Sequence, residues 1–64
     1  MFGKNLRKIR INFKWSQKFL SEKTGIPQTT ISDIETGKSI ANVEQALSIS
    51  KALDIPLNKL LGLG

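Results

Sequence analysis

Apolar residues recur along this chain at helical spacing, and no stretch alternates apolar and polar residues in the manner of a strand. We find no internal repeat. The pattern predicts an all-α domain of five short helices, at about 2–13, 17–24, 28–35, 42–53 and 56–61. The first helix has a narrow apolar stripe, made of Phe2, Leu6, Ile9 and Phe13. The fourth helix has a wide apolar arc, made of Val43, Ala46, Leu47, Ile49, Ser50 and Leu53, which predicts burial on two sides.

Turn and cap residues mark where these helices begin and end. Ser16 is expected to cap the second helix by accepting a hydrogen bond from an early backbone amide, and Gly25 to end it in a left-handed conformation. Pro27 fits the first turn of the third helix. Asn42 and Gln45 have the spacing of a capping box before the fourth helix. A link of about three residues between the second and third helices predicts the wide crossing angle of a helix-turn-helix.

The outer arc of the third helix differs from an ordinary solvated surface. Its residues are short or medium polar side chains, with no Lys or Arg, namely Gln28, Thr29, Ser32, Asp33 and Thr36. A merely solvated helix is usually rich in Lys and Glu, because these are better helix formers. Ile31 and Ile34 form the opposite, inward edge. The arc is therefore expected to make contact with a partner.

Charge points to a polyanionic partner. Ten Lys and Arg against five Asp and Glu give a formal net charge of +5, and residues 1–23 hold seven of the bases with one acid. One-sided basic clusters are typical of proteins that bind nucleic acid or an anionic membrane surface. No apolar run exceeds two residues, so we expect no membrane span, no signal peptide and a cytoplasmic protein.

The residue types leave little room for enzyme chemistry. The chain has no Cys and no His, which excludes disulfides, thiolate or imidazole metal sites and catalysis through His. The five acidic residues are scattered along the chain. We therefore expect no enzyme, no metal site and no cofactor.

Residues 17–36 have the spacing that a helix-turn-helix requires. A small residue lies at the expected helix crossing (Ser21), a glycine at the turn (Gly25), and branched apolar residues on the inner edge (Ile31 and Ile34). Four motifs extend this pattern along the chain: Leu6-Arg7-x-x-Arg10, Ser16-Gln17-x-x-Leu20-Ser21, Gly25-Ile26-Pro27-x-x-Thr30-Ile31-Ser32-x-Ile34-Glu35-x-Gly37-Lys38, and Ala52-Leu53-x-Ile55-x-Leu57-x-x-Leu60-Leu61. With these residues the chain resembles the Cro/CI-type (XRE) helix-turn-helix regulators, which include lambdoid-phage repressors. The resemblance implies that residues 1–64 form one compact lambda-repressor-like domain, which binds double-stranded operator DNA as a homodimer and regulates transcription.

The resemblance also implies roles for individual residues. Helix 28–36 would enter the major groove and read bases through Gln28, Thr29, Ser32 and Asp33. Gln28 is suited to adenine and the Thr29 methyl group to thymine. For Asp33 three roles remain: it contacts cytosine, it disfavours other bases, or its side chain turns away from the DNA. The backbone phosphates would be contacted by Ser16, Gln17, Thr36, Lys38 and Ser39.

Two further expectations concern structure and assembly. The resemblance implies an ion pair between Arg10 and Glu35 that joins the first helix to the third. The C-terminal segment holds more leucine than one small core needs, so its apolar residues are expected at a dimer interface, namely Ile55, Leu57, Leu60 and Leu61.

The function expected from these observations is a sequence-specific DNA-binding regulator, most simply a repressor. The alternative is an antitoxin-like interaction protein that neutralises a protein partner. A membrane-surface binder that uses the basic first helix is less favoured, because it gives the Gly25 turn and the polar arc no purpose.

Overall fold

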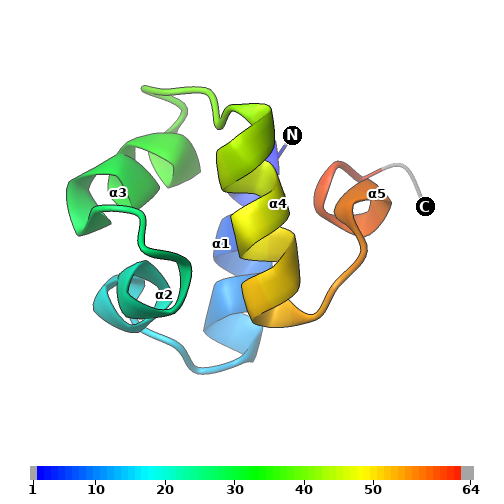
Figure 1. The fold of residues 1–64 in the computed structure, drawn as a ribbon, viewed down its shortest axis with the longest axis horizontal. Helices are drawn as coiled ribbons and strands as arrows, with labels where there is room; N and C mark the ends of the chain where they lie inside the picture. The colour runs from blue at the N-terminus through cyan, green and yellow to red at the C-terminus, as the bar shows by residue number, and fades with distance from the viewer. Residues whose placement is uncertain (1, 63–64) are drawn as a thin grey trace.

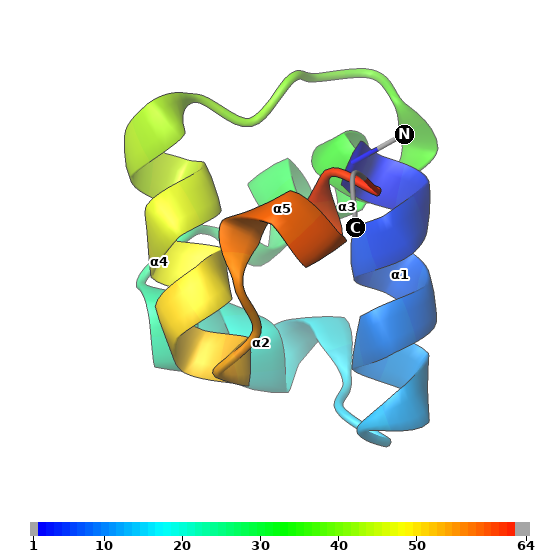
Figure 2. The same ribbon diagram turned by 90° about the vertical axis from the view of Figure 1, so that its right-hand side faces the viewer.

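The computed structural model describes residues 2–62 as five helices without strands. They are α1 (Phe2–Asn12), α2 (Gln17–Thr24), α3 (Gln28–Thr36), α4 (Val43–Leu53) and α5 (Leu57–Leu60). Figure 1 shows α4 in front of α1, with α2 and α3 on one side of them and α5 on the other. In the view turned by 90°, α5 lies between α4 and α1, both of which it contacts (Figure 2). The all-α, five-helix prediction is confirmed, with helix ends shifted by one residue at most.

One apolar core joins all five helices. Its buried members are Leu6, Leu20, Ile26, Ile31, Ile34, Ile49, Leu53 and Leu60. Each helix contributes at least one of these side chains, and burial of such a side chain stabilises a fold by about 1.5–3 kcal/mol. The short helices are therefore held in place by their packing, since isolated helices of this length are marginal in water.

The caps expected from the sequence are present. The Ser16 hydroxyl accepts a hydrogen bond from the backbone N–H of Phe19 at 3.0 Å. Both bonds of the capping box form, from the Gln45 N–H to the Asn42 side chain at 2.7 Å and from the Asn42 N–H to the Gln45 side chain at 3.1 Å. Gly25 ends α2 with φ +78°, a left-handed conformation that glycine adopts without steric cost.

The structure reveals a short repeat at the ends of α2 and α4, contrary to our expectation of none. Each copy has the pattern Ser-x-x-x-(Gly or Asp)-Ile-Pro, with positions Ser21, Gly25, Ile26 and Pro27 in the first and Ser50, Asp54, Ile55 and Pro56 in the second. In both copies the serine hydroxyl donates to the isoleucine carbonyl and the fifth residue has a positive φ. The proline then precedes the next helix directly. The same local chemistry thus builds the α2–α3 turn and the α4–α5 turn.

Three apolar residues predicted to face the core are exposed. Phe13, Val43 and Leu47 are 42%, 75% and 45% exposed, respectively. Phe13 lies beyond the last residue of α1, so it does not continue the stripe of that helix. In α4 the side bearing Ala46 and Ile49 is covered by the packing of the helix against α2 and α5, whereas Val43 and Leu47 lie outside these contacts.

Candidate nucleic-acid interface

The α2–α3 pair forms the helix-turn-helix. Gly25 turns the chain after α2, and Ile26 packs into the core. Pro27 precedes α3 with φ −55°, and no side chain caps the first amides of that helix. Uncapped amides at a helix N-terminus are suited to oxygen atoms of phosphate. The turn therefore presents the beginning of α3 outward while Ile31, fully buried, holds the helix from behind.

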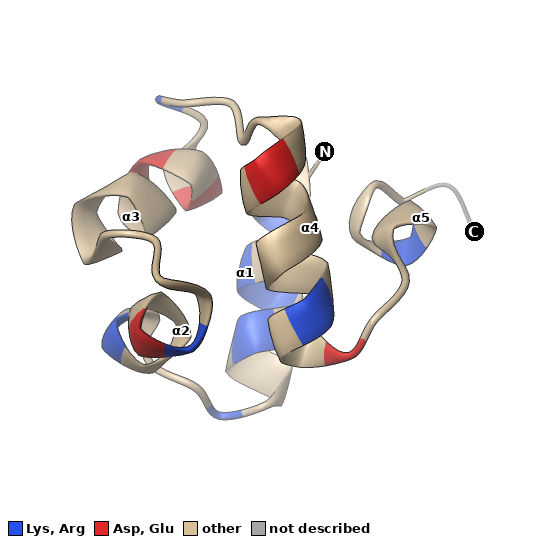
Figure 3. Cartoon of the chain, in the orientation of Figure 1, with Lys and Arg blue, Asp and Glu red and all other residues tan. Residues whose placement is uncertain are grey.

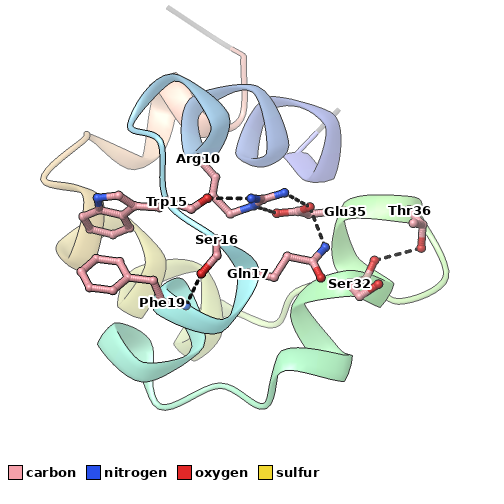
Figure 4. Close-up of polar contacts among 8 residues, drawn as sticks. All are labelled: Arg10, Trp15, Ser16, Gln17, Phe19, Ser32, Glu35 and Thr36. Atoms are coloured by element: carbon pink, nitrogen blue, oxygen red, sulfur yellow. Dashed lines mark hydrogen bonds and ion pairs between the residues drawn. The ribbon is translucent and has the colours of Figure 1, made fainter.

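A polar network braces the other end of α3 (Figure 4). The Arg10 guanidinium donates to both oxygens of Glu35, from Nε at 2.7 Å and from Nη2 at 3.0 Å. It also donates from Nη1 to the Trp15 carbonyl at 2.7 Å. Gln17 donates from Nε2 to Oε1 of Glu35 at 3.1 Å. The ion pair implied by the resemblance is therefore present, and it joins α1, the 13–16 loop and the start of α2 to α3.

This network is shielded from water. The side chain of Glu35 is 1% exposed and that of Arg10 is 11% exposed. Within residues 2–62, every buried side-chain nitrogen or oxygen has a hydrogen-bond partner. A buried ion pair of this kind fixes geometry more surely than it adds net stability, because desolvation offsets much of the attraction.

A close approach that the sequence pattern did not reveal also positions α3. A Cβ atom added to Gly3 of α1 would lie 2.0 Å from the carbonyl oxygen of Ile34 and 3.0 Å from its carbonyl carbon. Real Cβ atoms do not come this close, so any larger residue at this position would push α1 away from α3. A glycine inside an apolar helical pattern is the sequence signal that marks such a contact.

The four proposed base-contacting residues lie on the outer side of α3. Gln28 and Thr29 are exposed in its first turn, and Ser32 and Asp33 are half-buried one turn later. Spacings of four residues place Gln28 beside Ser32 and Thr29 beside Asp33 on the helix surface. The structure thus brings the four side chains to one continuous surface.

Ser16 and Gln17 lie together at the start of α2. The Ser16 oxygen accepts from Phe19 N–H, which leaves its hydroxyl hydrogen free to donate to a phosphate. One amide hydrogen of Gln17 is used by Glu35, and its second amide hydrogen remains available. Both residues retain a donor, as a phosphate contact requires.

The loop after α3 contains the other phosphate candidates. Lys38 and Ser39 are exposed there, and the backbone N–H of Ser39 donates to the Asp33 carbonyl at 3.1 Å. The Thr36 hydroxyl donates to the Ser32 carbonyl at 3.0 Å, so in this rotamer it has no hydrogen left for a phosphate. A phosphate contact by Thr36 through its hydroxyl requires a different rotamer.

The structure corrects the proposed dimer residues in one respect. Leu60 is fully buried in the core, because the single turn of α5 directs it between α1 and α4. It therefore offers no surface to a second copy. Ile55 and Leu57 are half-buried against the core, whereas Leu61 is 43% exposed. Leu61 and Ile40 both line an apolar groove of about 620 Å³ between the start of α1 and the loop after α3.

Charge is distributed unevenly around this interface. Figure 3 shows basic residues along α1, the following loop and α2, whereas the charged residues of α3 are acidic. These are Asp33 and Glu35, the second of which is neutralised by Arg10. Attraction to a polyanion therefore comes from residues around α3, whereas the outer side of α3 carries short polar groups.

Among the described residues, no helix has the length and apolar character that a membrane span requires. Residues 2–62 also contain no acidic cluster suited to a metal ion.

Comparison with known proteins agrees with this geometry. The restriction-modification controller protein C.AhdI from Aeromonas hydrophila has a similar structure, with a TM-score of 0.89 and 29% sequence identity over 92% of this chain and 89% of that chain. A comparison with curated protein sequences gave no significant match. A helix-turn-helix family model matches residues 6–60. Because that match spans most of the sequence, the chain belongs to the helix-turn-helix family of the Cro/CI (XRE) type, whose members are DNA-binding regulators of transcription.

Proposed function

We propose that the described helices act as one sequence-specific DNA-binding domain, which represses transcription by occupying promoter DNA. The observation that carries this proposal is the outer surface of α3. Gln28, Thr29, Ser32 and Asp33 form a polar surface without Lys or Arg, on a helix held rigidly from behind. An α-helix presented in this way fits the major groove, where base edges offer hydrogen-bond donors and acceptors.

Affinity and specificity would come from different residues. Ser16, Gln17, Lys38 and Ser39 flank α3 on two sides and would hold the phosphates, which fixes the register of the helix. Gln28 would pair with an adenine, and a bidentate contact of this kind contributes about 1–3 kcal/mol of discrimination between bases. The basic residues of α1 would raise the rate of association through their long-range field.

The regulator would act as a homodimer. A single recognition helix contacts few base pairs, and two copies related by a two-fold axis would contact half-sites one helical turn apart, about 34 Å. The exposed Leu61, beside Ile40 at the apolar groove, supports a contact near the end of α5. Ile55 and Leu57 would contribute their exposed edges.

The similarity to C.AhdI supports the regulatory role. That protein is a controller of a restriction-modification system, and its fold covers nearly all of the present chain. The proposal takes from it only the class of function, that of a controller protein.

Selection of bound sites from random duplex DNA at physiological salt tests the proposal. The protein is expected to enrich one short motif in two half-sites. Gln28→Ala should relax the preference at single base positions, and Asp33→Ala should do the same if that carboxylate contacts cytosine. Lys51→Gln, at an exposed position on α4 outside the proposed DNA and dimer contacts, is the control and should leave the motif unchanged. Enrichment of no motif, or uniform weakening by Gln28→Ala across all sequences, would contradict base contact by α3.

A further inference from the structure

Three aromatic side chains gather at the corner between α1 and α2, and we call Phe13, Trp15 and Phe19 the aromatic patch. The rings of Phe13 and Trp15 meet edge to face with centroids 5.5 Å apart. Those of Trp15 and Phe19 do the same at 4.8 Å. Trp15 packs against the core, whereas the two phenylalanines are 42% and 38% exposed. Two large exposed rings seated on a third form a preformed apolar surface.

None of the residues assigned to DNA contact belongs to this patch, although two of them, Ser16 and Gln17, lie between Trp15 and Phe19 in sequence. In Figure 4, Trp15 and Phe19 lie on the opposite side of the Arg10–Glu35 network from Ser32 and Thr36. With α3 in a groove, the aromatic patch would lie on the far side of the network from the base contacts and beside the phosphate contacts of Ser16 and Gln17. Aromatic residues at the centre of an exposed patch are typical of protein–protein contacts, where they contribute most of the binding energy.

Exposed lysines lie next to the aromatic residues in sequence or in space, and we call Lys14, Lys18 and Lys23 the lysine rim. Lys14 lies between two of the rings in sequence, and the Lys23 ammonium is 5.3 Å from the centroid of the Phe19 ring. The one ion pair within residues 2–62 joins Arg10 to Glu35, so the lysine rim is not neutralised there. Figure 3 shows basic residues on α1, on the loop after it and on α2, where Glu22 is the one acidic residue. The corner thus combines an apolar centre with a positive edge.

We propose that this corner is a docking surface for an acidic segment of a partner protein. An apolar side chain of the segment would rest on Phe13 and Phe19, and its carboxylates would pair with the lysine rim. The proposal uses none of the residues assigned to DNA contact.

Titration with short synthetic peptides tests this proposal. One peptide consists of Asp and Glu with leucines one helical turn apart, and its control has alanine in place of leucine. Anisotropy of the labelled peptide measures affinity, and emission from Trp15, the single tryptophan of the chain, reports the location. We expect saturable binding, a change in Trp15 emission, and affinity about tenfold lower for the alanine peptide, since loss of a buried leucine contact is typically of that size.

Charge-reversal variants provide the matched control. Lys18→Glu with Lys23→Glu should weaken leucine-peptide binding by at least about tenfold more than Lys51→Glu with Lys59→Glu, which changes the net charge equally on α4 and α5. Equal losses in the two pairs, equal binding of the two peptides, or no saturable response would overturn the proposal. A Trp15 response to duplex DNA with no response to either peptide would overturn the proposal as well. Gln28→Ala should leave peptide binding unchanged, so failure of this proposal is separable from failure of the DNA proposal.

Discussion

The buried carboxylate of Glu35 leads to a quantitative prediction about stability. Three hydrogen bonds converge on it, two from Arg10 at 2.7 and 3.0 Å and one from Gln17 at 3.1 Å. The variant Glu35→Gln keeps the shape of the side chain but removes its charge and replaces one acceptor oxygen with an amide donor. Arg10 then loses its counterion while it stays 11% exposed. Removal of one partner of a buried pair costs about 3–5 kcal/mol.

We expect a loss near the lower end of that range, about 3 kcal/mol, because Arg10 keeps its bond to the Trp15 carbonyl. A domain of this length has a free energy of unfolding of about 3–10 kcal/mol, so the variant loses a large part of its stability. The midpoint of thermal unfolding should fall by roughly 12–24 °C. Urea and thermal denaturation, followed by circular dichroism and Trp15 fluorescence, measure both quantities.

A double-mutant cycle separates the pair from its surroundings. Replacement of both residues by methionine removes both charges, and such apolar replacements are often close to neutral. The double variant should therefore be more stable, by about 2 kcal/mol or more, than the summed losses of Arg10→Met and Glu35→Met predict. A loss below about 0.5 kcal/mol in Glu35→Gln, the size expected of a surface substitution, would refute the reasoning. Simple additivity in the cycle would refute it as well.

Three further predictions follow from the backbone and the charge. Gly3→Ala should lower the free energy of unfolding by about 1–2 kcal/mol, because the new Cβ meets the Ile34 carbonyl, even though alanine has the better helix propensity. Urea titration measures this loss. In the same titration the control Lys8→Ala, on the exposed side of α1, should be neutral or stabilising. Asp54→Gly should raise the free energy of unfolding by about 1 kcal/mol, since Asp54 has φ +55°, and a decrease would show that its side chain stabilises the turn. If a dimer makes about six to eight phosphate contacts, log affinity for duplex DNA should fall with log salt with a slope of roughly −5 to −7, and a slope near zero in anisotropy titrations would exclude that many contacts.

The elements of the fold were predictable because each has a local signal. Ser16, Gly25 and Asn42 define helix ends through their own backbone and side-chain chemistry, which needs no tertiary context. The spacing of apolar residues identifies which side of a helix faces inward, but it does not show how much of that side a neighbouring helix covers. Val43 and Leu47 show the difference, since both stay exposed on a helix that packs against α2 and α5.

The candidate site was predictable in its composition and only partly in its geometry. The polar arc of α3 follows from the helical spacing of its polar residues. The ion pair of Arg10 with Glu35 was expected only from the family resemblance, because residues far apart in sequence carry no local signal of contact. Gly3 was missed since its role depends on a carbonyl of another helix. Leu60 was misplaced because a one-turn helix has too few residues to define an inward side.

Backbone amide spectra of labelled protein during titration with its selected duplex test the central claim most directly. If the outer surface of α3 enters a DNA groove, the largest shifts will fall on residues 28–36 and on the flanking Ser16, Gln17 and Lys38. Residues of α5 outside any dimer contact will shift little. A spectrum in which α3 stays unchanged while the α1 surface responds would contradict the account.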